Sequence, residues 1–134
     1  MSAATTANPV PARPHAVVWA EIPANDLDRA TRFYETILAT GLRREKFGPT
    51  ELAVLPYGEA GSGGAIVKSA DLVPSTTGTL VFLNCDQGLD QVLARVEPAG
   101  GRIDGAIVTL PDAMGRYARI RDCEGNCVGL HERG

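Results

Sequence analysis

Residues 16–38 read AVVWAEIPANDLDRATRFYETIL, and this stretch holds the first strand and the first helix of the fold. The β-branched and aromatic residues at its start predict a strand over residues 16–22. Asn25 follows as the expected helix N-cap, with Asp28 at the third helical position. One apolar stripe at spacings of three and four indicates the helix, made by Leu27, Ala30, Tyr34, Ile37 and Leu38. We expect Gly41 to end it.

Three short strands should follow this helix, over residues 42–47, 51–56 and 64–68. A glycine-rich connection at residues 57–63 joins the last two and has the composition of a mobile surface loop. The first half of the chain therefore has the order strand, helix, strand, strand, strand.

The same order returns after a polar joint at residues 69–78. A strand is predicted over residues 79–85, and Gly100-Gly101 should end a helix on the stripe Leu89, Val92, Leu93 and Val96. Three more strands fit residues 102–110, 116–121 and 126–132. The two helix openings, Asn-Asp-Leu-Asp at 25–28 and Gln-Gly-Leu-Asp at 87–90, align at an offset of 62 residues.

This repeat predicts an α+β fold of two βαβββ modules, at about 15–68 and about 79–132, within one domain over residues 15–134. Residues 1–14 are small, polar and proline-rich, so a disordered N-terminal arm is expected.

Composition excludes several classes of partner. The 134 residues carry 13 basic and 16 acidic side chains with no basic cluster, which argues against nucleic acid and anionic membranes. No apolar run is long enough to span a membrane and no export signal is recognisable, so a cytoplasmic location is expected. Cys123 and Cys127 flank a tight turn and could form half of a zinc site, but no second pair of soft ligands has a matching spacing. With Cys85 they are therefore expected to be reduced.

Side chains alternate between the two faces of a strand, and the face that packs on a helix must be apolar. Val18, Ala20 and Ile22 form that face in the first strand. The opposite face collects mixed side chains: Val17, Trp19, Glu21, Tyr117, Arg119, Arg121, Cys127, Gly129 and His131. Such a mixture suits a cleft for a small molecule, although an ordinary solvated face has the same composition.

Three segments carry a resemblance to a known family: DLDRATRFYE at 26–35, RVEPAGG at 95–101 and RDCEGNCVGLH at 121–131. With them the chain resembles the vicinal oxygen chelate superfamily of glyoxalase I, bleomycin-resistance proteins and extradiol dioxygenases. The resemblance implies paired βαβββ modules whose curved mixed sheets surround a ligand cleft. It also implies a homodimer, because members commonly pair, and the predicted strands present edges that a second chain could cover.

Enzymes of this superfamily hold a divalent metal with His or Glu on the first and last strands of each module. By resemblance, these positions fall on Trp19 in the first strand and Gly129 in the last. The other two ligand positions fall within residues 79–81, in the first strand of the second module, and within residues 65–67, in the last strand of the first module. None is a usual metal ligand, so we expect neither the customary metal nor another cofactor.

Glu21 and His131 lie one pleat repeat from the positions of the missing ligands. Both should point into the cleft, where a carboxylate beside an imidazole could transfer a proton. They could equally form a hydrogen bond without chemistry, or belong to a displaced metal site with His15 and Glu51 as further ligands.

The remaining candidates concern binding. Trp19 could stack on a planar ligand or simply fill the core, Tyr57 could close over a ligand or anchor its loop, and Arg119 could pair with an anionic group or face solvent. The first hypothesis is a metal-independent small-molecule binding protein that sequesters an aromatic or peptide-like compound, with Gly129 in its site. The alternative is a glyoxalase-like lyase or isomerase that uses Glu21 and His131. A non-catalytic partner of another protein is the third reading.

Overall fold

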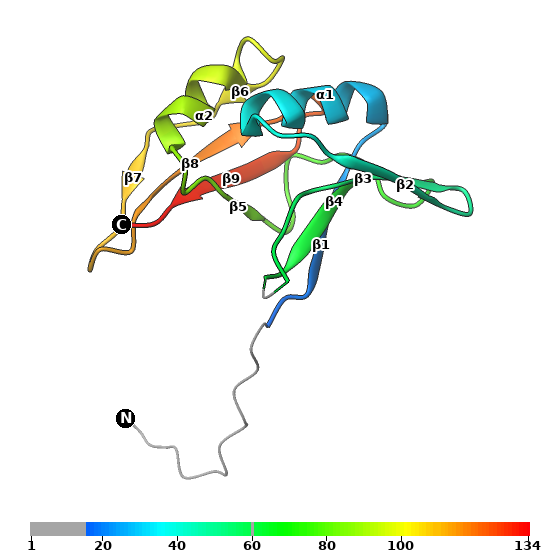
Figure 1. The fold of residues 1–134 in the computed structure, drawn as a ribbon. Helices are drawn as coiled ribbons and strands as arrows, with labels where there is room; N and C mark the ends of the chain where they lie inside the picture. Colours follow the sequence, from blue (N-terminus) through cyan, green and yellow to red (C-terminus); the bar gives the residue numbers. More distant parts are fainter. Residues whose placement is uncertain (1–15, 60) are drawn as a thin grey trace.

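The computed structural model describes residues 16–59 and 61–134 (Figure 1). The predicted arm at residues 1–14 and the candidate ligand His15 lie outside the described residues. No helix in the described part of the chain has the length and hydropathy needed to cross a membrane.

The first module forms a four-stranded sheet in the order β1-β4-β3-β2, with β1 parallel to β4 and the other pairs antiparallel. Its elements are β1 (Trp19–Pro23), α1 (Leu27–Leu38), β2 (Arg43–Phe47), β3 (Thr50–Val54) and β4 (Gly63–Lys68).

The second module repeats this arrangement in the order β5-β9-β8-β6, with β5 parallel to β9 and β7 also paired to β8. Its elements are β5 (Phe82–Asn84), α2 (Leu89–Val96), β6 (Arg102–Ile103), β7 (Val108–Thr109), β8 (Arg116–Arg121) and β9 (Cys127–Glu132). The strand predicted over residues 102–110 is wrong in one respect. It is broken into β6 and β7, because Gly105 turns the chain with a φ of 96°.

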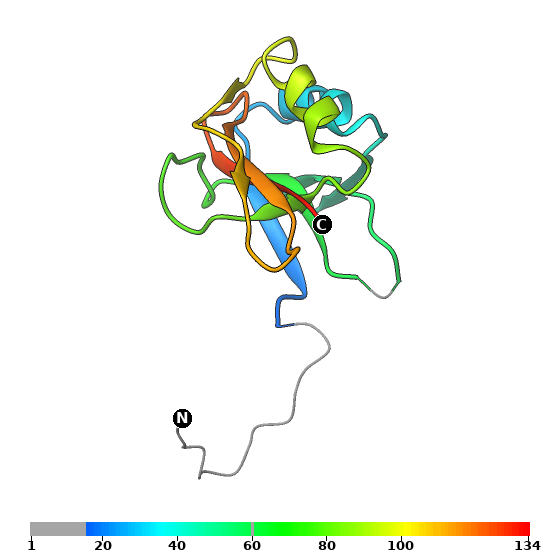
Figure 2. The ribbon, with the colours of Figure 1, turned by 90° about the vertical axis from the view of Figure 1, so that its left-hand side faces the viewer.

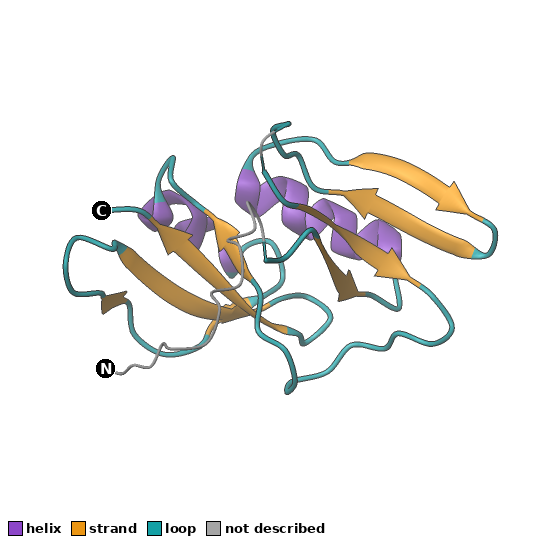
Figure 3. Ribbon diagram, turned by 90° about the horizontal axis from the view of Figure 1, so that it is seen from below, coloured by secondary structure: helices purple, strands orange, loops and turns teal. Residues whose placement is uncertain are grey.

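Both helices lie on the same side of the two sheets, as the side view in Figure 2 and the view from below in Figure 3 show. The predicted α+β architecture of two βαβββ modules is confirmed, and the helices begin at Leu27 and Leu89, at the predicted spacing. The predicted faces are confirmed in part. The helix-facing side chains share one buried core, which includes Ile22, Ile66, Ala118, Ile120, Val128 and Leu130. Val18, predicted for the same face, is wrong, because it precedes β1 and is 75% exposed.

A second buried apolar cluster lies on the opposite face of the first sheet and was not predicted. It consists of Leu52, Val54, Ala65 and Val67, which face one another across β3 and β4. The face that carries Trp19 and Glu21 is therefore apolar along β3 and β4, between mixed residues on β1 and the charged Arg43 and Glu45 on β2.

Both ends of α1 differ from the prediction by one or two residues. Asp26, not Asn25, is the N-cap, and its carboxylate accepts a hydrogen bond from the Arg29 amide at 3.0 Å. Ala39, not Gly41, ends the helix in the left-handed conformation with a φ of 53°. Its amide donates to the Glu35 and Thr36 carbonyls, and this satisfies the end of the helix before Gly41 is reached.

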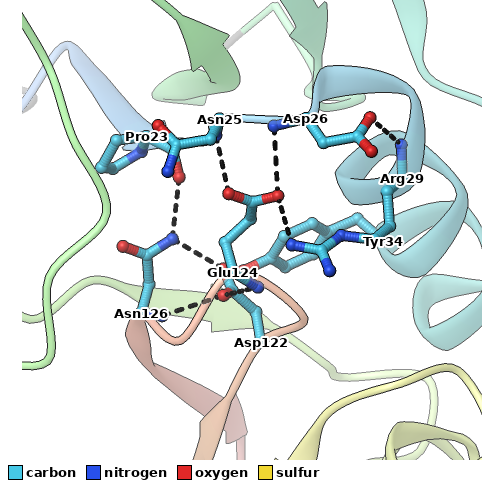
Figure 4. Close-up of polar contacts among 8 residues, drawn as sticks. All are labelled: Pro23, Asn25, Asp26, Arg29, Tyr34, Asp122, Glu124 and Asn126. Atoms are coloured by element: carbon cyan, nitrogen blue, oxygen red, sulfur yellow. Dashed lines mark hydrogen bonds and ion pairs between the residues drawn. The ribbon is translucent and has the colours of Figure 1, made fainter.

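A polar network joins the turn between β8 and β9 to the start of α1 (Figure 4). The Glu124 carboxylate accepts hydrogen bonds from the amides of Asn25 (2.6 Å) and Asp26 (3.2 Å) and from the Arg29 guanidinium (2.8 Å). Its side chain is only 2% exposed. A residue of the second module thus supplies acceptors to the helix N-terminus of the first.

Two further contacts tie the same turn to the first module. The Tyr34 hydroxyl donates to the Asp122 carboxylate at 2.6 Å, within the buried core. Burial and the neighbouring Asp122 charge raise the pKa of Tyr34 well above its ordinary value, so the phenol stays protonated and remains a donor. The Asn126 side-chain amide donates to the Pro23 carbonyl at 2.8 Å and to Asp122 at 3.0 Å.

Replacing Glu124 by Gln should destabilise the protein by about 1–3 kcal/mol at pH 7, because an amide cannot accept all three hydrogen bonds and leaves Arg29 without its counter-ion. The free energy of unfolding in urea measures the loss. Glu97→Gln is the matched control, because the Glu97 side chain is exposed and makes no hydrogen bond to another described residue.

The pH dependence of this difference tests its cause. Burial opposes ionisation of Glu124, but hydrogen bonds from Arg29, Asn25 and Asp26 outweigh it and lower the pKa below the ordinary 4.5. The contribution of the carboxylate is therefore complete above pH 4.5 and is lost as the pH falls through the folded-state pKa. A wild-type advantage over Glu124→Gln that stays constant down to pH 2 would contradict this account.

Candidate functional site

The candidate site lies on the faces of the two sheets that point away from the helices. In each module the first strand pairs in parallel with the last, and the register places Trp19 beside Gly63 in one sheet and Phe82 beside Gly129 in the other. The two pairs occupy different positions of the repeat. The amides of Ala24 and Cys85, which follow the last paired residues of β1 and β5, donate to the Val67 and His131 carbonyls, so Phe82 is equivalent to Glu21 and Gly129 to Ala65.

Each glycine lies beneath an aromatic ring. A Cβ atom at Gly63 would come within 2.7 Å of the Tyr57 ring, and one at Gly129 within 2.5 Å of Phe82 Cε1. Real Cβ atoms do not approach carbon this closely, so only glycine lets these rings lie down on the sheet.

The rings form two edge-to-face pairs. Trp19 and Tyr57 have centroids 6.0 Å apart at an interplanar angle of 83°, and Phe82 and Tyr117 have centroids 5.3 Å apart at 89°. Trp19 is 38%, Phe82 46% and Tyr57 51% exposed. Each pair is held by its neighbours yet presents apolar ring surface to solvent, as the wall of a binding site does.

The residues at these positions do not fit a divalent metal. Counting along the chain assigned the positions equivalent to Trp19 and Gly129 to residues 79–81 and 65–67. The strand register places them at Leu80 and Ala65, within those ranges. An indole, an isobutyl group, a methyl group and a glycine offer no carboxylate, imidazole or thiolate to a cation. Within the described ranges, no three His, Cys, Asp or Glu side chains gather so that they could hold a metal ion.

Glu21 and His131 line separate pockets. The Trp19 indole donates to the Glu21 carboxylate at 3.2 Å, whereas the His131 ring donates from Nε2 to the Met114 carbonyl at 2.8 Å. His131 borders an open depression of about 360 Å³ beside Phe82, Asn84 and Asp86. Glu21 and His131 do not form the hydrogen bond with each other that was one of the alternatives from the sequence.

Glu51, a candidate ligand of a displaced metal, lies on the wrong face. It has the parity of Ala53, which packs in the helix-side core, while Glu21 lies on the other face opposite Ala65. Glu51 instead approaches the Arg44 guanidinium at 3.8 Å.

Glu21 borders a second pocket, between the two modules, of about 430 Å³. The segment 75–81, which connects the sheets, forms one side. Arg119, Asn126 and Cys127 from the second sheet form another. Arg119 lies directly opposite Gly129 in the pair of β8 with β9, so this pocket adjoins the glycine beneath Phe82.

The three cysteines are free thiols. Burial raises the pKa of Cys85 and of Cys123 to about 11, which keeps both protonated near neutral pH. Cys127 alone borders the pocket between the modules.

Three residues of the aromatic pairs were not among the sequence candidates: Gly63, Phe82 and Tyr117. The internal repeat did not point to Phe82 as a counterpart of Trp19, because the strand register makes Phe82 equivalent to Glu21. Gly63 could not be recognised either, because it ends a glycine-rich segment whose boundary with β4 depends on strand pairing.

No family model matches the sequence, and no curated protein does. Solved structures do match. TnmS3, an antibiotic binding protein from Streptomyces sp. CB03234, superposes with a TM-score of 0.65 at 23% identity over 90% of this chain and 97% of its own. A glyoxylase/bleomycin resistance protein/dioxygenase domain from Frankia sp. gives 0.66 at 21% over 90% and 98%.

A glyoxalase I variant from Zea mays gives a TM-score of 0.65 at 20% identity over 85% of this chain. The chain spans only 44% of the length of that protein. The chain therefore has the fold of the glyoxalase/bleomycin resistance protein/dioxygenase, or vicinal oxygen chelate, superfamily.

Gly63→Ala and Gly129→Ala provide a matched test of the ring geometry. The new methyl group at residue 63 should push Tyr57 off the sheet and change the emission of Trp19, the only tryptophan. Gly129→Ala should move Phe82 instead and leave the emission of Trp19 as in the wild type. Steady-state fluorescence of the folded proteins measures both, and identical spectra for the two variants would contradict the pairing of Tyr57 with Trp19.

Proposed function

We propose that this protein binds a small aromatic or peptide-like molecule without a metal ion, using the half-exposed ring pairs as its principal contact. One observation carries the proposal. Trp19 and Phe82 lie on the edge strands of the two sheets, and each is next to a glycine over which an aromatic ring lies. Each module thus presents one aromatic ring pair on the face that points away from the helices.

The energetics favour a ligand with a planar apolar part. A stacked or edge-to-face aromatic contact contributes about 0.5–1.5 kcal/mol beyond the burial of its area. The rings are pre-positioned by the sheet, so little side-chain freedom is lost on binding. The likeness to an antibiotic binding protein of the same fold agrees with such a ligand.

The alternative of a lyase or isomerase would need Glu21 and His131 to act on one ligand. Their side chains border different pockets, and the only hydrogen bond of the His131 ring is to a main-chain carbonyl among the described residues. The geometry within one chain therefore supports binding better than proton transfer.

Trp19→Ala and Phe82→Ala should each weaken binding of the dye 1-anilinonaphthalene-8-sulfonate about tenfold, which is about 1.4 kcal/mol. Phe47→Ala removes an exposed aromatic side chain outside the two ring pairs and serves as the control. Titration of dye fluorescence, with and without a metal chelator, gives the dissociation constants. Equal affinities for all four proteins, or loss of binding with the chelator, would refute the proposal.

We also propose that the protein is a homodimer. In both sheets the first strand, β1 or β5, is an edge strand that carries a half-exposed ring, Trp19 or Phe82. Exposed apolar edges are usually covered by another chain. Light scattering should give twice the 14.1 kDa of one chain, and a mass of 14.1 kDa at micromolar concentration would disprove the dimer.

A further inference from the structure

Two opposite charges border the pocket between the modules. Glu21 enters from β1 and Arg119 from β8, so each sheet contributes one charge to the same space of about 430 Å³. The segment that connects the sheets contributes hydroxyl groups, from Ser75, Thr76, Thr77 and Thr79. The lining therefore combines a positive and a negative group with apolar side chains, among them Leu72, Val73 and Val81.

Arg119 differs from the other two arginines of β8. Arg116 pairs with Glu132 at 2.9 Å, and Arg121 pairs with Asp104 at 2.9 Å and donates to the Thr76 carbonyl at 3.1 Å. Arg119 has no ion-pair partner among residues 16–59 and 61–134. Its guanidinium, with five donors in a planar fork, is available for a carboxylate or a phosphate.

Glu21 also has no ion-pair partner among the described residues, but a hydrogen bond holds its carboxylate in place. The Trp19 indole donates to one of its carboxylate oxygens, and no lysine or arginine of the described residues lies within ion-pair distance. The carboxylate is thus oriented by Trp19, the ring that contacts the ligand in the proposed function. The other oxygen remains as an acceptor for an ammonium group.

We infer that the ligand is zwitterionic, with a cationic group that binds Glu21 and an anionic group that binds Arg119 in the pocket between the modules. The inference rests on the proposed function, since it assigns the polar part of a ligand whose planar part lies on Trp19 or Phe82. A ligand with one charge meets one favourable and one unfavourable pole, whereas a zwitterion satisfies both. Each pole is solvent-exposed and should change affinity by up to about fivefold.

Four compounds with one skeleton test this assignment: 2-naphthylalanine, its methyl ester, its N-acetyl derivative and the N-acetyl methyl ester. They share the naphthalene ring and are zwitterionic, cationic, anionic and neutral, respectively. Isothermal titration calorimetry with the full-length protein at low salt should rank the zwitterion first and should place the three others about threefold to fivefold or more below it.

Two variants separate the poles. Glu21→Gln should abolish the preference for a free amine over an N-acetyl group and keep the preference for acid over ester. Arg119→Gln should do the reverse. Glu97→Gln and Arg102→Gln, exposed charges on α2's end and on β6, should retain both preferences.

The outcomes distinguish the inference from the function on which it rests. Equal binding of the four compounds that is lost in Trp19→Ala would overturn the zwitterion and leave aromatic binding in place. No binding of any compound would overturn both. A preference that neither Glu21→Gln nor Arg119→Gln changes would show that the charge selection comes from elsewhere, and this too would overturn the inference.

Discussion

The arrangement of the two modules depends on a buried carboxylate. Glu124 lies in the turn between the last two strands, yet its oxygens accept from the N-terminal amides of α1 almost a hundred residues earlier. The second helix has a similar contact, because Glu132 of β9 accepts a hydrogen bond from the Leu89 amide at 2.8 Å. The hairpin of β8 and β9 therefore bonds to the N-terminal ends of both helices and links the two modules. Asn126 donates to the Pro23 carbonyl and accepts from the Ser75 amide, so the same hairpin also holds the segment that borders the pocket between the modules.

The candidate site follows from strand register more than from any unusual residue. Parallel pairing of the first and last strand of each module places a large ring next to a glycine in each sheet, Trp19 beside Gly63 and Phe82 beside Gly129, at different positions of the repeat. The glycines remove the side chain that would lift a ring, and the rings remain half exposed because each lies at the edge of its sheet. Ring contact and charge contact are adjacent, since Glu21 is one pleat from Trp19 and Arg119 is opposite Gly129.

Local patterns predicted the elements whose formation is local. The stripe at residues 89–96 gives α2, although the helix ends at Val96 and not at Gly100-Gly101 as predicted, and the alternation at 116–121 gives β8. The N-cap of α1 is Asp26 and not Asn25, and local pattern could not choose between them because Asn and Asp are about equally favoured as N-caps. Likewise, alternation placed Glu21 and His131 on the ligand-side faces of their strands. It could not show that the two faces belong to separate sheets, so that the two side chains border different pockets.

The close fit of rings over glycines also constrains how this scaffold can change through mutation. A carboxylate at residue 129 would require Phe82 to vacate the space first, and one at residue 63 would require Tyr57 to do so. Substitution at either glycine is therefore coupled to the ring above it, and a larger side chain there needs a compensating change at Phe82 or Tyr57.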